Sequence, residues 1–239
     1  SKSNGGGAAL IAAAEKAAQK SIKGKKGKRL AGAVSDYLQH VPHHDLSGMD
    51  GTEIAGLIAA HLATGDVRKP GKAKIRVYTP QKKRDGWSTE HSVIEIVTDD
   101  MPFLVDSISS ELTRRELPIH LVIHPILKVR RDKAGKVIDI LERGHVDIDA
   151  RSESFMHFQI TQQPDAALKE IEAALHDVLR DVQYSVVDWR PMRERMETVI
   201  DDLNIEPKGI LLEEAQEVRE LLRWLHDNHF TFLGFREYK

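Results

Sequence analysis

The stretch from His91 to Glu116, HSVIEIVTDDMPFLVDSISSELTRRE, constrains the fold more than any other part of the sequence. It begins with an apolar run from Val93 to Val97 that only Glu95 interrupts, which is typical of a strand covered on both faces. Apolar residues then recur at a spacing of four, which indicates a helix with one apolar face. These residues are Leu104, Ile108 and Leu112. A buried strand joined this closely to an amphipathic helix predicts the first half of a βαβ unit.

A short acidic segment, residues 99–103, links the predicted strand to the predicted helix, and we call it the bend. Pro102 is expected in the first turn of the helix, where the N–H that proline lacks has no partner to lose. Backbone N–H groups at a helix start can hold an anion, and nearby carboxylates can hold an ammonium group, so the bend could capture an amino acid. Alternatively, Asp99 and Asp100 cap the helix and Asp106 is simply exposed. The candidate site residues are Asp99, Asp100, Met101, Pro102, Phe103 and Asp106.

Further strands and one long helix follow the bend. Strands are predicted at residues 119–126, 137–141, 155–160 and 184–189, and a helix at 164–182. Pro125 interrupts the first of these strands and indicates a bulge or an edge position. The element order from residue 91 is then β-α-β-β-(β)-α-β. This order predicts an α+β fold, a ferredoxin-like βαββαβ sandwich with helical additions at both ends.

The N-terminal part of the chain is basic. Residues 1–30 contain eight basic side chains and one acidic one, a sum of +7, so the remainder carries −9 of the net charge of −2. Such a segment could bind nucleic acid, or it could be a solvated terminus. Residues 8–22 have few apolar side chains to bury and are predicted as a frayed helix or one that forms against a partner. Residues 23–28 are predicted as a charged linker.

The sequence contains little that points to catalysis or metal binding. No predicted strand is followed by a dinucleotide fingerprint, and there is no Walker loop. The chain has no cysteine, which excludes thiolate chemistry and fits a cytoplasmic protein. His120 and His124 share a strand face but lie about 13 Å apart at roughly 3.3 Å per residue, too far to share a zinc ion. We therefore predict no metal site, and interface positions for these two histidines.

Several motifs resemble the N-terminal region of the large bacterial NAD-specific glutamate dehydrogenases. They are DDMPFLVDS, HP-x-L-x-V-R-R-D, V-x-DW-x-x-M and the FLGFREY near the end. The resemblance spans about residues 30–239 and implies an ACT-type regulatory module ahead of a dehydrogenase core. In other ACT families the loop at the bend often contains a glycine that lets an effector approach. The bend contains none, which leaves effector binding and an interface role both open.

The resemblance also implies a domain organisation. The predicted segments are a basic Ala/Lys-rich arm (1–29), a helical lead-in with a connecting strand (30–90), an ACT-like domain (91–190), and a helical linker with the first strand of a following module (191–239). The first strand of the following module is expected in the aromatic sequence HFTFLGFREYK.

The function implied is that of a non-catalytic regulatory and oligomerisation segment. The parent enzyme would use NAD to convert L-glutamate to 2-oxoglutarate and ammonium, and the segment itself would hold no cofactor. Its expected partners are the rest of the polypeptide, further copies of the chain and an amino-acid effector. It would be cytoplasmic, because no apolar run approaches the roughly 20 residues of a membrane helix.

Two alternatives come from other classes of protein. RNA-recognition domains share the ferredoxin-like architecture and stack bases on aromatic residues of their central strands. Here the predicted central strand has no aromatic residue, and only Phe155 and Phe158 lie on a neighbouring strand, so nucleic-acid binding is not expected. The other alternative is a free-standing amino-acid sensor.

Overall fold

The computed structural model describes residues 4–21, 25–39, 41–46, 48–141, 147–203 and 211–230, together with residues 232, 234 and 236. The chain divides into two compact units, Ser1–Leu179 (unit 1) and Arg180–Lys239 (unit 2). Within the described ranges, no helix combines the length and the apolar character needed to cross a bilayer.

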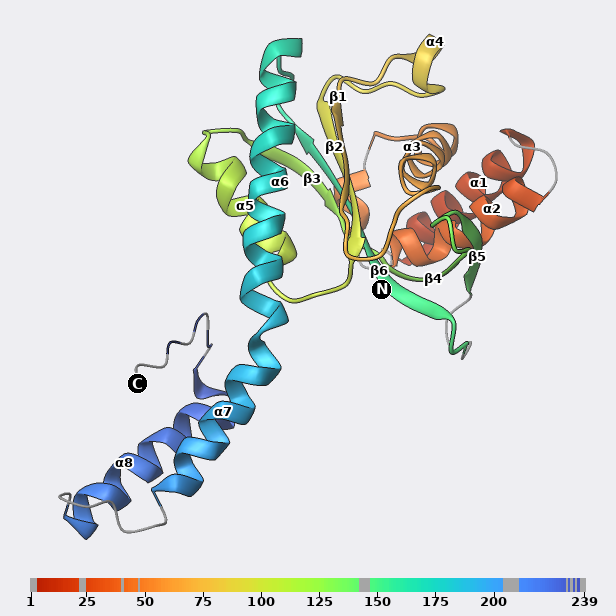
Figure 1. Cartoon of the computed structure of the whole chain (residues 1–239). Coiled ribbons are helices and arrows are strands. Elements are labelled where there is room, and N and C mark those ends of the chain that lie inside the picture. Colours follow the sequence, from red (N-terminus) through yellow and green to blue (C-terminus); the bar gives the residue numbers. More distant parts are fainter. Residues whose placement is uncertain are drawn as a thin grey trace. The chain divides into compact units, whose positions relative to one another are not determined.

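Unit 1 is built on a six-stranded antiparallel sheet (Figure 1). The strands run in the order β1-β2-β6-β4-β5, and β3 also pairs with β6. The single strand predicted at residues 119–126 is wrong, because the chain is interrupted at His124 and Pro125 into β3 and β4, which both pair with β6. The long strand β6 is therefore the centre of the sheet. The strands are β1 (Lys74–Tyr78), β2 (Ser92–Asp99), β3 (Ile119–Ile123), β4 (Ile126–Arg131), β5 (Val137–Leu141) and β6 (Ala150–Ile160).

Helices cover both faces of this sheet. In Figure 1, α5 (Leu104–Arg114) and the first part of α6 (Asp165–Val187) lie on one face. Three helices lie on the other: α1 (Asn4–Ser21), α2 (Lys25–Leu38) and α3 (Gly51–Thr64). Two short helical segments complete the unit, η1 (His43–Leu46) and α4 (Lys82–Asp85). The predicted α+β class is confirmed.

The pairing register assigns alternate residues of β2 and β6 to opposite faces. Ile94 pairs with Phe158 and Ile96 with Met156, and all four are buried on the face that α5 covers. The apolar stripe predicted for α5 is confirmed, since its three members are 0–2% exposed. These members are Leu104, Ile108 and Leu112.

The opposite face alternates between apolar and polar side chains. Val93 and Val97 belong to a core shared with α1–α3, and Glu95 lies between them. Across the sheet, Glu95 pairs with His157, and both side chains are fully buried. The run from Val93 to Val97 therefore contributes to two faces of different character.

The expectation of a frayed N-terminal helix is wrong. Ala14 and Ala18 of α1 are 0% exposed and belong to the core shared with α2 and α3. The first residue of α3, Gly51, lies so close that an added Cβ would be 2.6 Å from the carbonyl carbon of Ala13. Small residues on both helices allow this approach, and the partly buried Leu10 and Ile11 of α1 also pack against this core. The predicted linker is also partly helical, because α2 begins at Lys25; residues 22–24 lie outside the described ranges.

The predicted strand at residues 184–189 is wrong, and with it the βαββαβ order. Helix α6 continues to Val187, and α7 begins at Trp189. The sequence between Leu179 and Trp189 has no glycine, proline or asparagine to end the helix. The closing strand of a ferredoxin-like sheet would pair with β2, and β1 from the N-terminal side takes that place.

Unit 2 contains α7 (Trp189–Asp202), α8 (Leu212–Trp224) and a π-helical turn, η2 (Leu225–His229). Met192 and Ile200 of α7 and Ala215 of α8 are buried. Many of its large apolar side chains are exposed: Tyr184, Val187, Trp189, Leu211, Leu212, Val218, Leu221, Trp224 and Phe230. Most of the predicted aromatic strand near residue 239 lies outside the described residues. The predicted domain boundaries stay predictions.

Candidate functional site

The bend connects the end of β2 at Asp99 to the start of α5 at Leu104. Phe103 immediately precedes the helix with a φ of 68°, a left-handed conformation that is rare for a bulky residue. Pro102 therefore lies before the helix and not in its first turn, which corrects the prediction. Among the residues that the structure describes, no side chain caps the start of α5 or accepts from its first backbone N–H groups.

Asp99 faces away from the start of α5 and joins the bend to the loop after α3. Its Oδ1 accepts a hydrogen bond from Nη2 of Arg68 at 2.6 Å, and its Oδ2 accepts one from the backbone N–H of Gly71 at 2.7 Å. The suggestion that Asp99 caps the helix is therefore wrong. Arg68 is 3% exposed and is anchored further by the carbonyl of Lys72 at 3.0 Å. The end of β2 is thus held by a residue 31 positions earlier in the sequence.

Arg68 belongs to a buried ionic network that continues onto β6 and β4. The carboxylate of Glu153 lies 2.8 Å from Nη2 of Arg68 and accepts two hydrogen bonds of 2.7 Å from Arg131. Glu153 is 1% exposed, so the two guanidinium groups offset the cost of burying its charge. Arg131 also donates to the carbonyl of Gly135 at 2.7 Å. We call Arg68, Asp99, Arg131 and Glu153 the ionic network, and it fixes the position of the bend.

Asp100 and His124, two predicted site residues, are joined through Ser154. The Ser154 hydroxyl donates to Oδ1 of Asp100 at 2.7 Å, and Nε2 of His124 lies 3.0 Å from the same hydroxyl. Burial lowers the pKa of His124, and the nearby charge of Asp100 works in the opposite direction. Because Ser154 is buried and gives its proton to a carboxylate and not to the imidazole, it lacks the geometry of a serine activated by histidine. The arrangement positions Asp100 and does not build a nucleophile.

An open hollow of about 460 Å³ lies against the bend, and we call it the bend hollow. It brings together most of the predicted site: its lining residues are Asp100, Met101, Pro102, Phe103, Leu104, Val105, Asp106, His124 and Ile126. Phe103 is 45% exposed and Ile126 is 54% exposed, so part of its lining is an open apolar surface. The uncapped start of α5 adds backbone N–H donors and the positive end of a helix dipole. The hollow thus combines carboxylates, a donor-rich helix start and apolar side chains.

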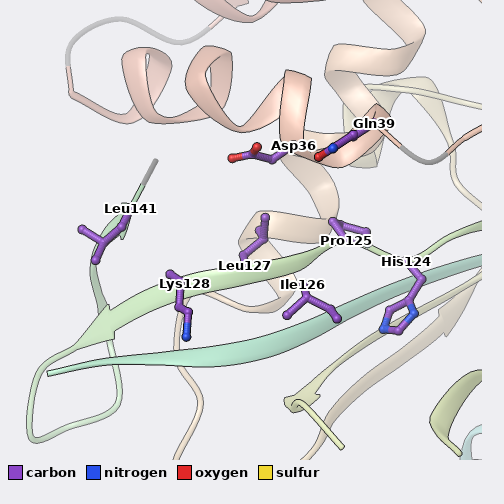
Figure 2. A pocket seen from close by; sticks show the side chains of 8 residues that line it. All are labelled: Asp36, Gln39, His124, Pro125, Ile126, Leu127, Lys128 and Leu141. Atoms are coloured by element: carbon purple, nitrogen blue, oxygen red, sulfur yellow. The ribbon is translucent and has the colours of Figure 1, made fainter. Parts of the chain in front are cut away.

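A smaller hollow of about 130 Å³ lies between the end of α2 and residues 124–128 (Figure 2). It shares His124 and Ile126 with the bend hollow and is also lined by Asp36 and Gln39 at the end of α2. In Figure 2, Leu127 points toward α2, whereas Lys128 points away from Asp36. Asp36 and Lys128 therefore do not form an opposed pair of charges around one ligand.

His120 is placed apart from the bend hollow. Its ring stacks on that of His91 with the centroids 4.3 Å apart, and its Nε2 lies 2.9 Å from Oγ1 of Thr161. Burial lowers the pKa of His91, and the charge of His120 lowers it further. The structure therefore does not bring His120 and His124 together. Whether either one contacts a partner stays a prediction.

Sequence reasoning missed a second cluster of polar groups, between α3 and the sheet, which we call the polar seam. Oε1 of Glu95 accepts a hydrogen bond from the hydroxyl of Tyr78 at 2.7 Å, and its Oε2 accepts one from Thr64. Burial raises the pKa of Glu95, and these hydroxyl donors offset part of that rise. The members of the seam are Tyr37, His61, Thr64, Tyr78, Glu95 and His157. One signal was present in the sequence: a charged residue inside a run of buried apolar ones.

Neither cluster forms a metal site. Within the described ranges, no three histidine, aspartate or glutamate side chains are placed to hold one ion. The ionic network pairs its charges internally, and in the polar seam Glu95 is bonded to Tyr78 and Thr64. In the bend hollow, polar and apolar groups remain open to another molecule.

Comparison with known proteins places residues 33–175 in the family described as "Glutamate dehydrogenase, ACT1 domain". The NAD-specific glutamate dehydrogenase of Pseudomonas aeruginosa is 38% identical over 166 residues, which cover 69% of this chain and 10% of that protein. The enzyme of Halomonas elongata is 35% identical over 172 residues, 71% of this chain and 11% of that protein. That of Mycobacterium tuberculosis is 25% identical over 182 residues. The match thus spans about a tenth of the length of these relatives.

Proposed function

This chain belongs to the glutamate dehydrogenase ACT1 domain family, and on that premise we propose that it is a non-catalytic regulatory and assembly segment of an NAD-dependent glutamate dehydrogenase. The parent enzyme would oxidise L-glutamate to 2-oxoglutarate and ammonium with NAD. The observation that carries the proposal is the family match over residues 33–175, which contains the whole bend and all residues lining the bend hollow. We assign no NAD-binding residue to this chain, and a cytoplasmic location is part of the same proposal.

An activity assay tests the non-catalytic part of this proposal. The 239-residue chain is mixed with L-glutamate and NAD, and NADH is followed by its absorbance. We expect no glutamate-dependent NADH. A full-length NAD-specific glutamate dehydrogenase, such as the relative from Pseudomonas aeruginosa, serves as the positive control. Turnover by the chain alone would contradict the proposal.

We further propose that the bend hollow binds an amino-acid effector. An amino acid carries both an ammonium and a carboxylate group, and the hollow offers Asp100 and Asp106 for the first and the uncapped start of α5 for the second. A thermal-shift screen of the twenty amino acids tests this, because a ligand at 100 times its Kd stabilises the folded state by about 2.7 kcal/mol. We expect at least one amino acid to raise the melting temperature, and Asp106→Asn to reduce that shift. Asp106 is exposed and makes a suitable probe because its replacement leaves the Asp100–Ser154 hydrogen bond in place.

The exposed side chains of Phe103 and Ile126 favour a second role for the same surface, the docking of another module or another copy of the chain. Here the measurement is the molar mass in solution, by light scattering across a concentration series. A docking role predicts a mass that rises with concentration for the natural chain and less steeply for Ile126→Ser. Flat melting curves in the amino-acid screen together with a concentration-independent monomer mass would remove support from both roles.

Two alternatives from the sequence are less well supported. Phe155 and Phe158 are 1% and 0% exposed, so these two rings do not offer the stacking surface that RNA recognition uses. Salt-sensitive binding of single-stranded RNA would revive that alternative. A free-standing amino-acid sensor makes the same prediction as the effector proposal for the melting screen. The two differ in whether the effector changes the activity of a longer enzyme.

A further inference from the structure

The polar seam places one buried histidine on each side of the boundary between α3 and the sheet. His61 lies on α3 and His157 on β6, both are 0% exposed, and their ring centroids are 6.0 Å apart. Nε2 of His61 lies 3.2 Å from the carbonyl oxygen of Ile96, so this nitrogen carries the proton and donates it. Nδ1 of His61 and Nδ1 of His157 have no hydrogen-bond partner in the described part of the chain. Both rings are therefore held in the neutral form.

The groups that face these two rings come from every neighbouring element, and they leave a new positive charge uncompensated. Glu95 on β2 is the nearest carboxylate of the seam, and it is already bonded to Tyr78 of β1 and Thr64 of α3. The Arg76 guanidinium of β1 lies 4.0 Å from the same carboxylate and adds a positive charge. Tyr37 of α2 also faces the seam, with its ring centroid 5.8 Å from that of His61, and its pKa is raised by burial and by Glu95.

We propose that the polar seam is a proton-sensitive joint: when His61 and His157 take up protons, the layer formed by α1–α3 opens from the sheet while the α5 face stays folded. Two imidazolium ions 6.0 Å apart in a buried layer repel each other and lose their hydration, and opening restores water to both. The α5 face has its own apolar core, built on Ile94, Ile96 and Phe158. A sheet covered by helices on one face is a stable arrangement, so the two sides can differ in their free energy of opening.

The direction of the proton effect follows from the two histidines. Burial lowers the pKa of His61 to about 4, and burial together with His61 lowers the pKa of His157 well below its ordinary value. In the open layer both return toward about 6.5. Between these limits the open state binds more protons than the closed state, so opening increases as the pH falls. Glu95 acts in the opposite sense, because its raised pKa makes the closed state hold a proton that the open state releases above about pH 4.5. This one carboxyl offsets at most one proton, so the two histidines decide the net direction below about pH 6.5.

Native-state hydrogen exchange on the 239-residue chain between pH 7 and pH 5, corrected for intrinsic exchange rates, tests the proposal. We expect the protection of the amides of α3 to fall as the pH falls, whereas the protection of the amides of α5 stays constant. Each histidine can raise the opening constant by up to about tenfold for each unit by which the pH falls. In His157→Gln, the protection of the α3 amides should therefore fall less with pH than in the natural chain, by a factor of up to about ten for each pH unit. Equal losses of protection in α3 and α5, or an unchanged slope in His157→Gln, would overturn the proposal.

A control and a second measurement protect the test against a variant that does not fold. His120→Gln removes an exposed histidine outside the seam and should leave the slope unchanged. If His157→Gln does not fold, the proposal is tested on the natural chain by following the histidine ring signals against pH with nuclear magnetic resonance. Two buried histidines that stay neutral until α3 loses protection support the proposal. Two that titrate near pH 6.5 while α3 keeps its protection contradict it.

Discussion

On the face of the sheet covered by α5, neighbouring strands place Ile94 against Phe158 and Ile96 against Met156, whereas on the opposite face Glu95 lies against His157. Both faces are fully buried at these positions. The first is stabilised by contact area, which tolerates small shifts in position. The second depends on hydrogen bonds with fixed geometry, because a buried polar group that loses its partner costs free energy. One sheet thus combines a tolerant apolar side with a polar side that holds the bend.

The largest effect is expected on the apolar face. Phe158→Ala removes a fully buried ring and should lower the free energy of unfolding by about 3–5 kcal/mol. Urea denaturation followed by circular dichroism measures the loss. The same substitution at the half-exposed Phe103 should cost less than about 1 kcal/mol. Similar losses at the two positions would mean that the apolar face is not the main source of stability.

The contact between α1 and α3 gives the next largest effect. Gly51→Ala places a Cβ 2.6 Å from the backbone of Ala13 and should destabilise the chain by about 1–3 kcal/mol. Gly32 in α2 is the matched control, because no atom lies within 4 Å of its added Cβ. Gly32→Ala should stabilise the chain by about 0.5–1 kcal/mol through helix propensity. A neutral Gly51→Ala would show that α1 is not packed closely against α3.

The polar face should also differ from the apolar face in its response to pH. The lowered pKa values of His61 and His157 stabilise the folded chain fully above about pH 6.5, and that contribution is lost as the pH falls from about 6.5 toward 4. Each histidine contributes at most about 1.4 kcal/mol per pH unit in that range. Urea denaturation at pH 7, 6 and 5 measures the slope, which should be shallower in His61→Gln than in the natural chain. An equal slope would mean that other groups cause the acid sensitivity.

The smallest effect is expected at the end of α5. Glu116 has a φ of 56°, and the backbone N–H of the next residue, Leu117, closes the helix on Leu112 at 3.0 Å. This left-handed position favours glycine, so Glu116→Gly should raise the free energy of unfolding by about 0.5–1 kcal/mol. Ser110→Gly inside the same helix should lower it by about 0.5 kcal/mol, which is the control for glycine itself. Thermal melts of the two variants should therefore shift in opposite directions.

Local patterns in the sequence were enough to predict the apolar face. The spacing of Leu104, Ile108 and Leu112 predicts α5, and the run ending at Val97 predicts β2. The prediction of a last strand at residues 184–189 was wrong, because the outcome depends on strand pairing that a local pattern does not show. Residues 184–187 have strand-forming side chains, but no residue between Leu179 and Trp189 ends the helix, and β1 pairs with β2 instead.

The polar face could not be predicted, because its partners are far apart in the sequence. Arg68 is 31 residues from Asp99 and 85 from Glu153, and no short motif links them. Ser154 and His124, which position Asp100, are likewise separated by 30 residues. The sequence therefore identified the bend as the candidate site, but not the groups that hold it.

The central claim is that the polar face holds the bend through the contact between Arg68 and Asp99. A double-mutant cycle with Arg68→Met and Asp99→Asn, measured by urea denaturation, tests this contact most directly. We predict that the two substitutions are coupled by about 1–3 kcal/mol, because the contact is a 2.6 Å ion pair with a buried guanidinium group. Additive effects, with a coupling below about 0.3 kcal/mol, would contradict the claim.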